Sequence, residues 1–167
     1  LPAQPQVFQW HGQAVQEKTL VDCIQGGINP YRDYSDYLAF AKKPELRFII
    51  SNTTEAGIAY VPTDSFEDAP PSSFPGKLTR FLFERYQAFA GATDKGLVVI
   101  PCELIDRNGD QLKAIVLKLA QDWKLDPDFT DWVKNTCTFC NTLVDRIVPG
   151  YPKDRGEELY DELGYTD

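Results

Sequence analysis

The order in which strand-like and helix-like segments follow one another constrains the fold of this chain more than any other feature. Compact apolar runs rich in β-branched residues occupy 47–51, 97–100 and 142–148, as expected of strands buried within a sheet. Apolar residues recur at helical spacing in the segments between or beside them, at 34–41, 77–89, 112–123 and 129–133. Strands that alternate with helices are joined by right-handed crossovers. The sequence therefore predicts an α/β fold, a parallel sheet with flanking helices, in which 47–51 is a central strand.

The segments outside this alternation are predicted to form simpler structures. Residues 7–10 and 19–24 carry β-branched and aromatic side chains next to glycines, which indicates two short strands or a hairpin. The proline-rich stretch 62–75 cannot continue a strand ladder and is expected to be a surface loop. The sequence Asn108-Gly109-Asp110 is typical of a turn and helix cap.

Composition excludes several classes of partner. The formal charge is −8 and no cluster of Lys and Arg supplies a basic face, so nucleic acid is not expected to bind. No apolar run approaches the roughly 18 residues that a membrane span needs. Four cysteines without an apolar leader indicate reduced thiols in a cytoplasmic protein. The chain has no Met and begins at Leu1, so we expect a piece of a longer protein.

Counting residues also excludes several standard catalytic sites. His11 is the single histidine of the chain. A Ser-His-Asp triad, a zinc protease motif or a two-histidine iron site could not be built without it. Gly91 and Gly96 have the spacing of a P-loop, but Leu97 and Val98 stand where Lys and Ser or Thr are required. No G-x-G-x-x-G occurs among the 11 glycines, and no metal site is expected.

The two cysteines Cys137 and Cys140 form a C-x-x-C sequence between a predicted helix and a predicted strand. A redox pair would place the first cysteine exposed at a helix N-terminus, and a zinc site would need two further ligands. We interpret both as reduced structural cysteines, and a thiol redox protein remains an alternative.

Polar segments follow each predicted strand, which is where open α/β sheets bind their ligands. These segments are 51–57, 102–109 and the region of Asn141. If the strands are neighbours, the segments meet at one edge of the sheet. Glu55 and Glu103 could act there as a general acid and base, or each could hold a loop through backbone N–H groups.

Three ordered motifs, SNTTEAG at 51–57, PCELIDRNGD at 101–110 and CNTLVDRIV at 140–148, resemble the mannitol dehydrogenase family of long-chain polyol dehydrogenases. Further similarity lies at 66–70, 77–80 and 162–165. The resemblance implies a Rossmann-like NAD domain and metal-independent hydride transfer. Within the family it is strongest to members that reduce the sugar acid tagaturonate to altronate, and fructuronate or a mannitol-type polyol is the alternative substrate.

The resemblance also implies roles for individual residues and domain limits. Cofactor-binding positions would be Ser51, Asn52, Thr53, Thr54 and Glu55. Glu103 would lie near the nicotinamide, in the proton path, and Asn141 would donate its amide to the reacting oxygen. Residues 1–150 would be a partial NAD-binding domain, and 151–167 an acidic segment leading toward a substrate domain.

Two elements of the family pattern are missing from the sequence. The glycine-rich phosphate loop is not found, and none of the lysines is followed by the N-x-x-H of the family's catalytic lysine motif. The fold is thus expected to be incomplete, and the isolated chain inactive. A non-catalytic interaction module with Rossmann topology is the alternative from a different functional class, and the oligomeric state is left open.

Overall fold

The computed structural model describes residues 5–10, 13–18, 23–54, 56–143 and 161. The chain divides into two compact units, one of residues 28–145 and one of residues 1–27 with 146–167. In the second unit, strands β1 (Pro5–Trp10) and β2 (Gln13–Lys18) pair antiparallel. The hairpin confirms the expected pairing, but its second strand lies earlier than 19–24. In a tight hairpin the second strand begins directly after the turn, so β2 begins at Gln13, close to the end of β1.

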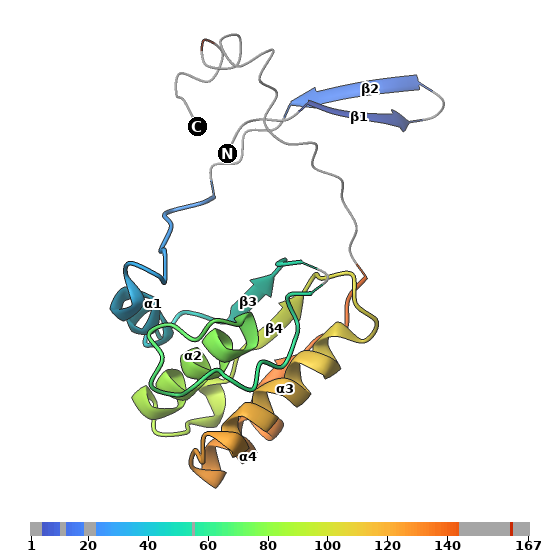
Figure 1. The fold of residues 1–167 in the computed structure, drawn as a ribbon. Helices are drawn as coiled ribbons and strands as arrows, with labels where there is room; N and C mark the ends of the chain where they lie inside the picture. The colour runs from blue at the N-terminus through green and yellow to red at the C-terminus, as the bar shows by residue number, and fades with distance from the viewer. Residues whose placement is uncertain (1–4, 11–12, 19–22, 55, 144–160, 162–167) are drawn as a thin grey trace. The chain divides into compact units, whose positions relative to one another are not determined.

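The unit of residues 28–145 contains a three-stranded parallel sheet. Its strands are β3 (Phe48–Ser51), β4 (Val98–Pro101) and β5 (Thr138–Phe139), in the order β3-β4-β5. Both neighbouring pairs are parallel. The helices of this unit are α1 (Tyr34–Ala41), α2 (Phe74–Ala88), α3 (Asn108–Asp122) and α4 (Pro127–Thr136), with a 3-10 turn η1 at Thr93–Lys95. Figure 1 shows the helices of this unit together with the strands, α3 lying beside β4, and the predicted parallel α/β arrangement is confirmed.

Two predictions about the strands differ from what the described residues show. The third strand is Thr138–Phe139, whereas Thr142 and Leu143 are in a loop and 144–148 lie outside the described residues. The shorter strand is selected because it pairs in register with Val98 and Val99, next to the end of α4. The run 47–51 is at the edge of the described sheet rather than at its centre. Accordingly Phe48 and Ile50 are 50% and 69% exposed, although the apolar run predicted burial on both faces.

The helices begin at local capping signals. Helix α2 starts at Phe74, three residues before the expected start, because the Ser73 hydroxyl accepts a hydrogen bond from the N–H of Gly76 and Pro75 fits the first turn. Helix α3 starts at Asn108, so the expected turn residues form its first turn instead of preceding it. Arg107 is the residue before this helix and has a left-handed backbone with φ of 50°.

The hydrophobic core lies between the helices and one face of the sheet. Buried side chains from α2, α3, α4 and β4 include Leu78, Leu82, Leu112, Val116, Phe129, Val133 and Val99. Those on the helices occupy the apolar positions that helical periodicity predicts. No helix among the described residues is long and apolar enough to cross a membrane.

A buried guanidinium joins several segments of this unit. Arg85 of α2 is 1% exposed and donates hydrogen bonds to the backbone oxygens of Ala41, Lys43, Leu46 and Lys95, at 2.6 to 3.0 Å. Burial lowers the pKa of Arg85 from its ordinary value. Because its charge is balanced by carbonyl dipoles, including those at the C-terminus of α1, Arg85 fixes the chain segment that leads into β3.

Candidate functional site

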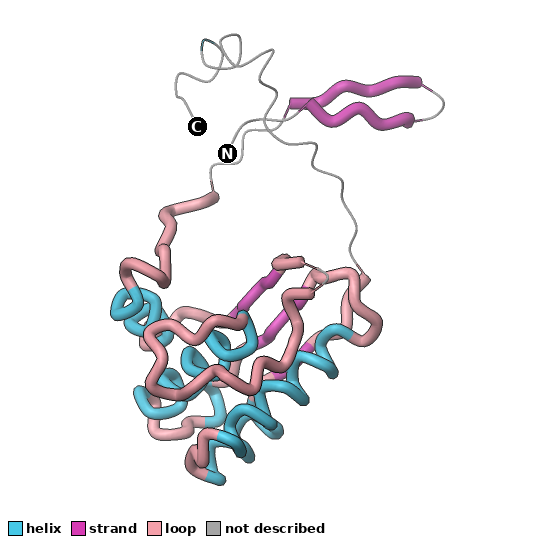
Figure 2. The backbone as a smooth tube through the Cα atoms, in the orientation of Figure 1, coloured by secondary structure: helices cyan, strands magenta, loops and turns pink. Residues whose placement is uncertain are grey.

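The carboxyl ends of the parallel strands bring the predicted polar segments together. The N–H of Cys102, after β4, donates to the carbonyl oxygen of Ser51 at 2.7 Å. The hydroxyl of Thr142, after β5, donates to the carbonyl oxygen of Pro101. Figure 2 shows the loops that leave the strands at this edge. The expected meeting of the three segments is therefore confirmed.

Glu103 is the buried centre of the first junction. Glu103 is only 3% exposed. One carboxylate oxygen accepts from the backbone N–H of Thr53 at 3.1 Å and from the Thr53 hydroxyl at 2.8 Å. The other accepts from the hydroxyl of Ser51 at 3.0 Å. Since both oxygens are engaged, the geometry favours the loop-holding role of Glu103 over proton transfer.

The second junction is centred on Asn108, a residue that the sequence analysis treated only as part of a turn. It is completely buried. Its Nδ2 donates to the carbonyl oxygens of Pro101 and Glu103, each at 3.0 Å, and to that of Thr142 at 3.2 Å. Its Oδ1 accepts from the N–H groups of Thr142 at 3.0 Å and Gly109 at 2.8 Å. The position of this asparagine within the post-strand segment 102–109 was the available signal.

Asn141 lies beside the first turn of α3. Its Oδ1 accepts from the N–H of Asp110 at 3.0 Å, and its Nδ2 donates to the Asp110 carboxylate at 3.1 Å. The hydrogen bonds from Asn141 and Arg107 lower the pKa of Asp110. A Cβ at Gly109 would lie 2.4 Å from the carbonyl oxygen of Cys140, so glycine is required for this close approach. The segment after β5 is thus held against α3.

The remaining predicted site residues differ in their exposure. Asn52, Thr53 and Thr54 are exposed at the strand end, whereas Ser51 is buried. Asn141 is exposed, unlike Glu103. Glu55 lies outside the described residues, as does His11. The arrangement is a polar edge with buried anchors and exposed amide and hydroxyl groups, which is suited to binding a ligand through hydrogen bonds.

The C-x-x-C sequence lies next to this edge. Cys137 is buried and ends α4, and Cys140 is partly buried after β5. Burial raises the pKa of Cys137 to about 11. A thiol with this pKa is protonated at neutral pH, which supports the interpretation of Cys137 as a structural residue.

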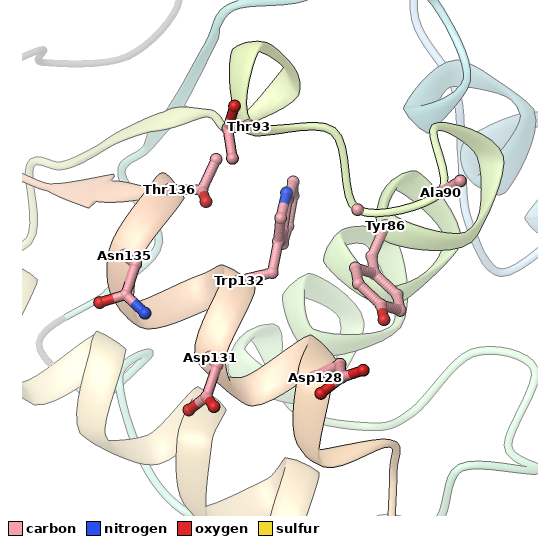
Figure 3. A pocket seen from close by; sticks show the side chains of 9 residues that line it. Tyr86, Ala90, Thr93, Asp128, Asp131, Trp132, Asn135 and Thr136 are labelled. Atoms are coloured by element: carbon pink, nitrogen blue, oxygen red, sulfur yellow. The ribbon is translucent and has the colours of Figure 1, made fainter.

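A separate hollow of about 400 Å³ lies between α2 and α4. Figure 3 shows the rings of Tyr86 and Trp132 in its wall, with Asp128 and Asp131 along α4. The indole N–H of Trp132 is already bonded to the carbonyl oxygen of Ala92 at 3.1 Å. None of the polar segments after the strands lines this hollow.

Comparison with known proteins gives consistent results at the level of sequence and fold. The family model described as the mannitol dehydrogenase Rossmann domain matches residues 9–167. Altronate oxidoreductases from Yersinia enterocolitica and Pectobacterium carotovorum are each 56% identical over 156 residues, which is 93% of this chain and 32% of theirs. The chain thus spans about a third of the length of these relatives.

A solved structure resembles the chain in fold. It is the Pseudomonas fluorescens mannitol 2-dehydrogenase in a ternary complex with NAD and D-mannitol. The TM-score is 0.71 at 21% sequence identity, over 88% of this chain and 31% of that one. The match confirms the expected Rossmann-type fold.

Proposed function

The chain belongs to the mannitol dehydrogenase family, and from this membership we propose that it is part of an NAD-dependent oxidoreductase that reduces tagaturonate to altronate. The identity of 56% to altronate oxidoreductases supports this substrate pair. Because the chain spans about a third of those relatives, the activity belongs to the longer protein. Residues 1–150 form part of its NAD-binding domain, and 151–167 lead toward the substrate domain.

The meeting of three polar segments at the carboxyl ends of β3, β4 and β5 is the observation that carries the proposal. Ligands of open α/β sheets bind at this edge, because the loops after the strands converge there. The side chains at the edge include amides, hydroxyls and the Glu103 carboxylate, which is already covered by donors. Such an edge can hold a ribose or an amide through hydrogen bonds.

Exposed groups at the end of β3 fit the cofactor in this arrangement. Asn52, Thr53 and Thr54 are exposed, although the N–H and the hydroxyl of Thr53 are used by Glu103. Ser51 and Glu103 anchor this segment to the interior, since both are buried and the Ser51 hydroxyl donates a hydrogen bond to the Glu103 carboxylate. Glu55 is included among the cofactor-binding positions by its place in the motif. When bound, NADH would supply the hydride for the ketone carbon and leave as NAD+, and the ketone oxygen would gain a proton.

Asn141 is the donor to the reacting oxygen in this proposal. One of its two amide hydrogens is used by Asp110, at 3.1 Å from Nδ2, and the other remains for a ligand. A donor directed at developing negative charge contributes about 3 kcal/mol to catalysis. Asp110 and Arg107 hold the amide in place through their own ion pair of 2.7 Å.

The test is an assay of the longer protein that contains this chain. With NADH and tagaturonate it should produce altronate, with fructuronate and fructose as comparison substrates. The Asn141→Ala variant should lose about 100-fold in kcat, whereas Asn135→Ala, an exposed position on α4, should retain activity. Reduction of another ketose without turnover of tagaturonate would contradict the proposed substrate.

A further inference from the structure

The side chain of Asn108 has one chemically consistent orientation in the structure. Its Oδ1 faces two N–H donors, and its Nδ2 faces three carbonyl oxygens. Exchanging the two atoms would place the amide NH2 group against the N–H donors and the amide oxygen against the carbonyl oxygens. The buried site is thus built for an amide and not for a carboxylate, a hydroxyl or an apolar side chain.

The partners of Asn108 belong to segments on two different strands. Pro101 and Glu103 follow β4, and Thr142 follows β5. The first of these segments carries the Glu103 carboxylate that holds Ser51 and Thr53. Because Thr142 is the neighbour of Asn141 in the chain, fixing the backbone of Thr142 also restricts where the Asn141 amide can lie.

We propose that Asn108 is a positioning residue for the hydride-transfer site: its buried amide joins the segment after β4 to the segment after β5 and thereby fixes Asn141 relative to the cofactor-binding end of β3. This inference rests on the proposed function. Asn108 touches neither substrate nor cofactor, and it acts on the reaction through Asn141.

A purely local capping role predicts different behaviour. Of the partners of Asn108, only Gly109 belongs to α3, whereas the others lie outside the helix. An aspartate in the first turn of a helix is favourable, because its charge complements the helix dipole. Asn108→Asp should therefore be neutral or stabilising if Asn108 only caps α3. It should be disruptive if the amide must donate to Pro101 and Glu103.

The first experiment measures amide hydrogen exchange by NMR in the 167-residue chain. In Asn108→Asp, the N–H groups of Thr142 and Asp110 should exchange about 10-fold faster than in the unsubstituted chain. Thr79→Val is the matched control, since the buried Thr79 hydroxyl donates to Pro75 at 2.8 Å inside α2. The control should leave exchange at both positions unchanged. Unchanged exchange in Asn108→Asp would overturn the proposal.

The second experiment measures steady-state kinetics in the longer protein. Asn108→Asp should lower kcat by about 10-fold with the KM for NADH within about 2-fold, because the donor to the reacting oxygen is displaced while the β3 end is retained. Turnover that is insensitive to Asn108→Asp would overturn the positioning role alone. Lack of tagaturonate reduction by the unsubstituted protein would instead overturn the proposed function, and with it any part of Asn108 in that reaction.

Discussion

Replacing Glu103 tests how much of the strand-end structure depends on one buried carboxylate. Glu103→Leu removes the acceptor of three hydrogen bonds, from the Ser51 hydroxyl and from the N–H and hydroxyl of Thr53. At about 1 kcal/mol for each, the loss in unfolding free energy is about 3 kcal/mol. Domains of this kind have total stabilities of only about 5 to 15 kcal/mol, so the effect should be large.

Glu103→Gln should cost much less than Glu103→Leu. The amide oxygen of glutamine can still accept from Thr53, and the Ser51 hydroxyl can rotate to accept from the amide nitrogen. What is lost is the strengthening that a negative charge gives to a hydrogen bond, about 1 kcal/mol in total. The order of stability is therefore unsubstituted, then Gln, then Leu.

Urea unfolding followed by tryptophan fluorescence and circular dichroism measures these differences. Glu67→Leu is the control, because Glu67 is exposed and should change the unfolding free energy by less than about 0.5 kcal/mol. The reasoning is refuted if Glu103→Leu is within about 1 kcal/mol of the unsubstituted chain, or if the Gln and Leu variants are equally stable.

Three other predictions concern stability and reactivity elsewhere in the chain. Arg85→Met should destabilise the chain by about 4 kcal/mol in the same urea assay, because four carbonyl oxygens lose a buried donor; a loss below about 1 kcal/mol would contradict this. For Asp64, burial acts to raise the pKa, but hydrogen bonds from Ser72 and Ser73 outweigh burial and leave the pKa below its ordinary 3.8. A carboxyl with a lowered pKa stabilises the fold above pH 3.8, and this stabilisation is lost as the pH falls below that value. In Asp64→Asn the unfolding free energy should therefore decrease less steeply toward acid pH. An unchanged slope would disprove the assignment. Since the pKa of Cys137 is about 11 and Cys23 is exposed, iodoacetamide at pH 7.5 should modify Cys23 at least about 100-fold faster, and comparable rates, read by mass spectrometry, would revive a redox role.

The sequence predicted the elements of the sheet and helices best where burial and periodicity act together. The runs around Ile49 and Val99 and the helix containing Leu112 and Val116 were located correctly because their apolar patterns reflect contact with one core. The strand Thr138–Phe139 was missed because the run 142–148 is more apolar. Pairing with β4 decided its position, and pairing is not visible in a single segment.

The candidate site was predicted in its location but not in its internal connections. The rule that ligands bind after parallel strands placed Ser51, Glu103 and Asn141 at one edge. It could not show that Glu103 is enclosed by donors, because the facing hydroxyls lie about 50 residues away in the sequence. Asn108 was missed for the same reason, since its partner Thr142 is 34 residues distant. The resemblance of the motifs supplied roles for individual residues that physical patterns alone do not assign.

The most direct test of the central claim is an NMR titration of the 167-residue chain with NADH. The account predicts no saturation below about 1 mM, because the chain lacks a glycine-rich phosphate loop, and weak shifts confined to Asn52, Thr53, Thr54 and the region of Asn141. Saturation at micromolar NADH would contradict the expectation that the phosphate contacts are missing. Shifts centred on Trp132 and Asp128 in the hollow between α2 and α4 would contradict the placement of the cofactor at the ends of β3, β4 and β5.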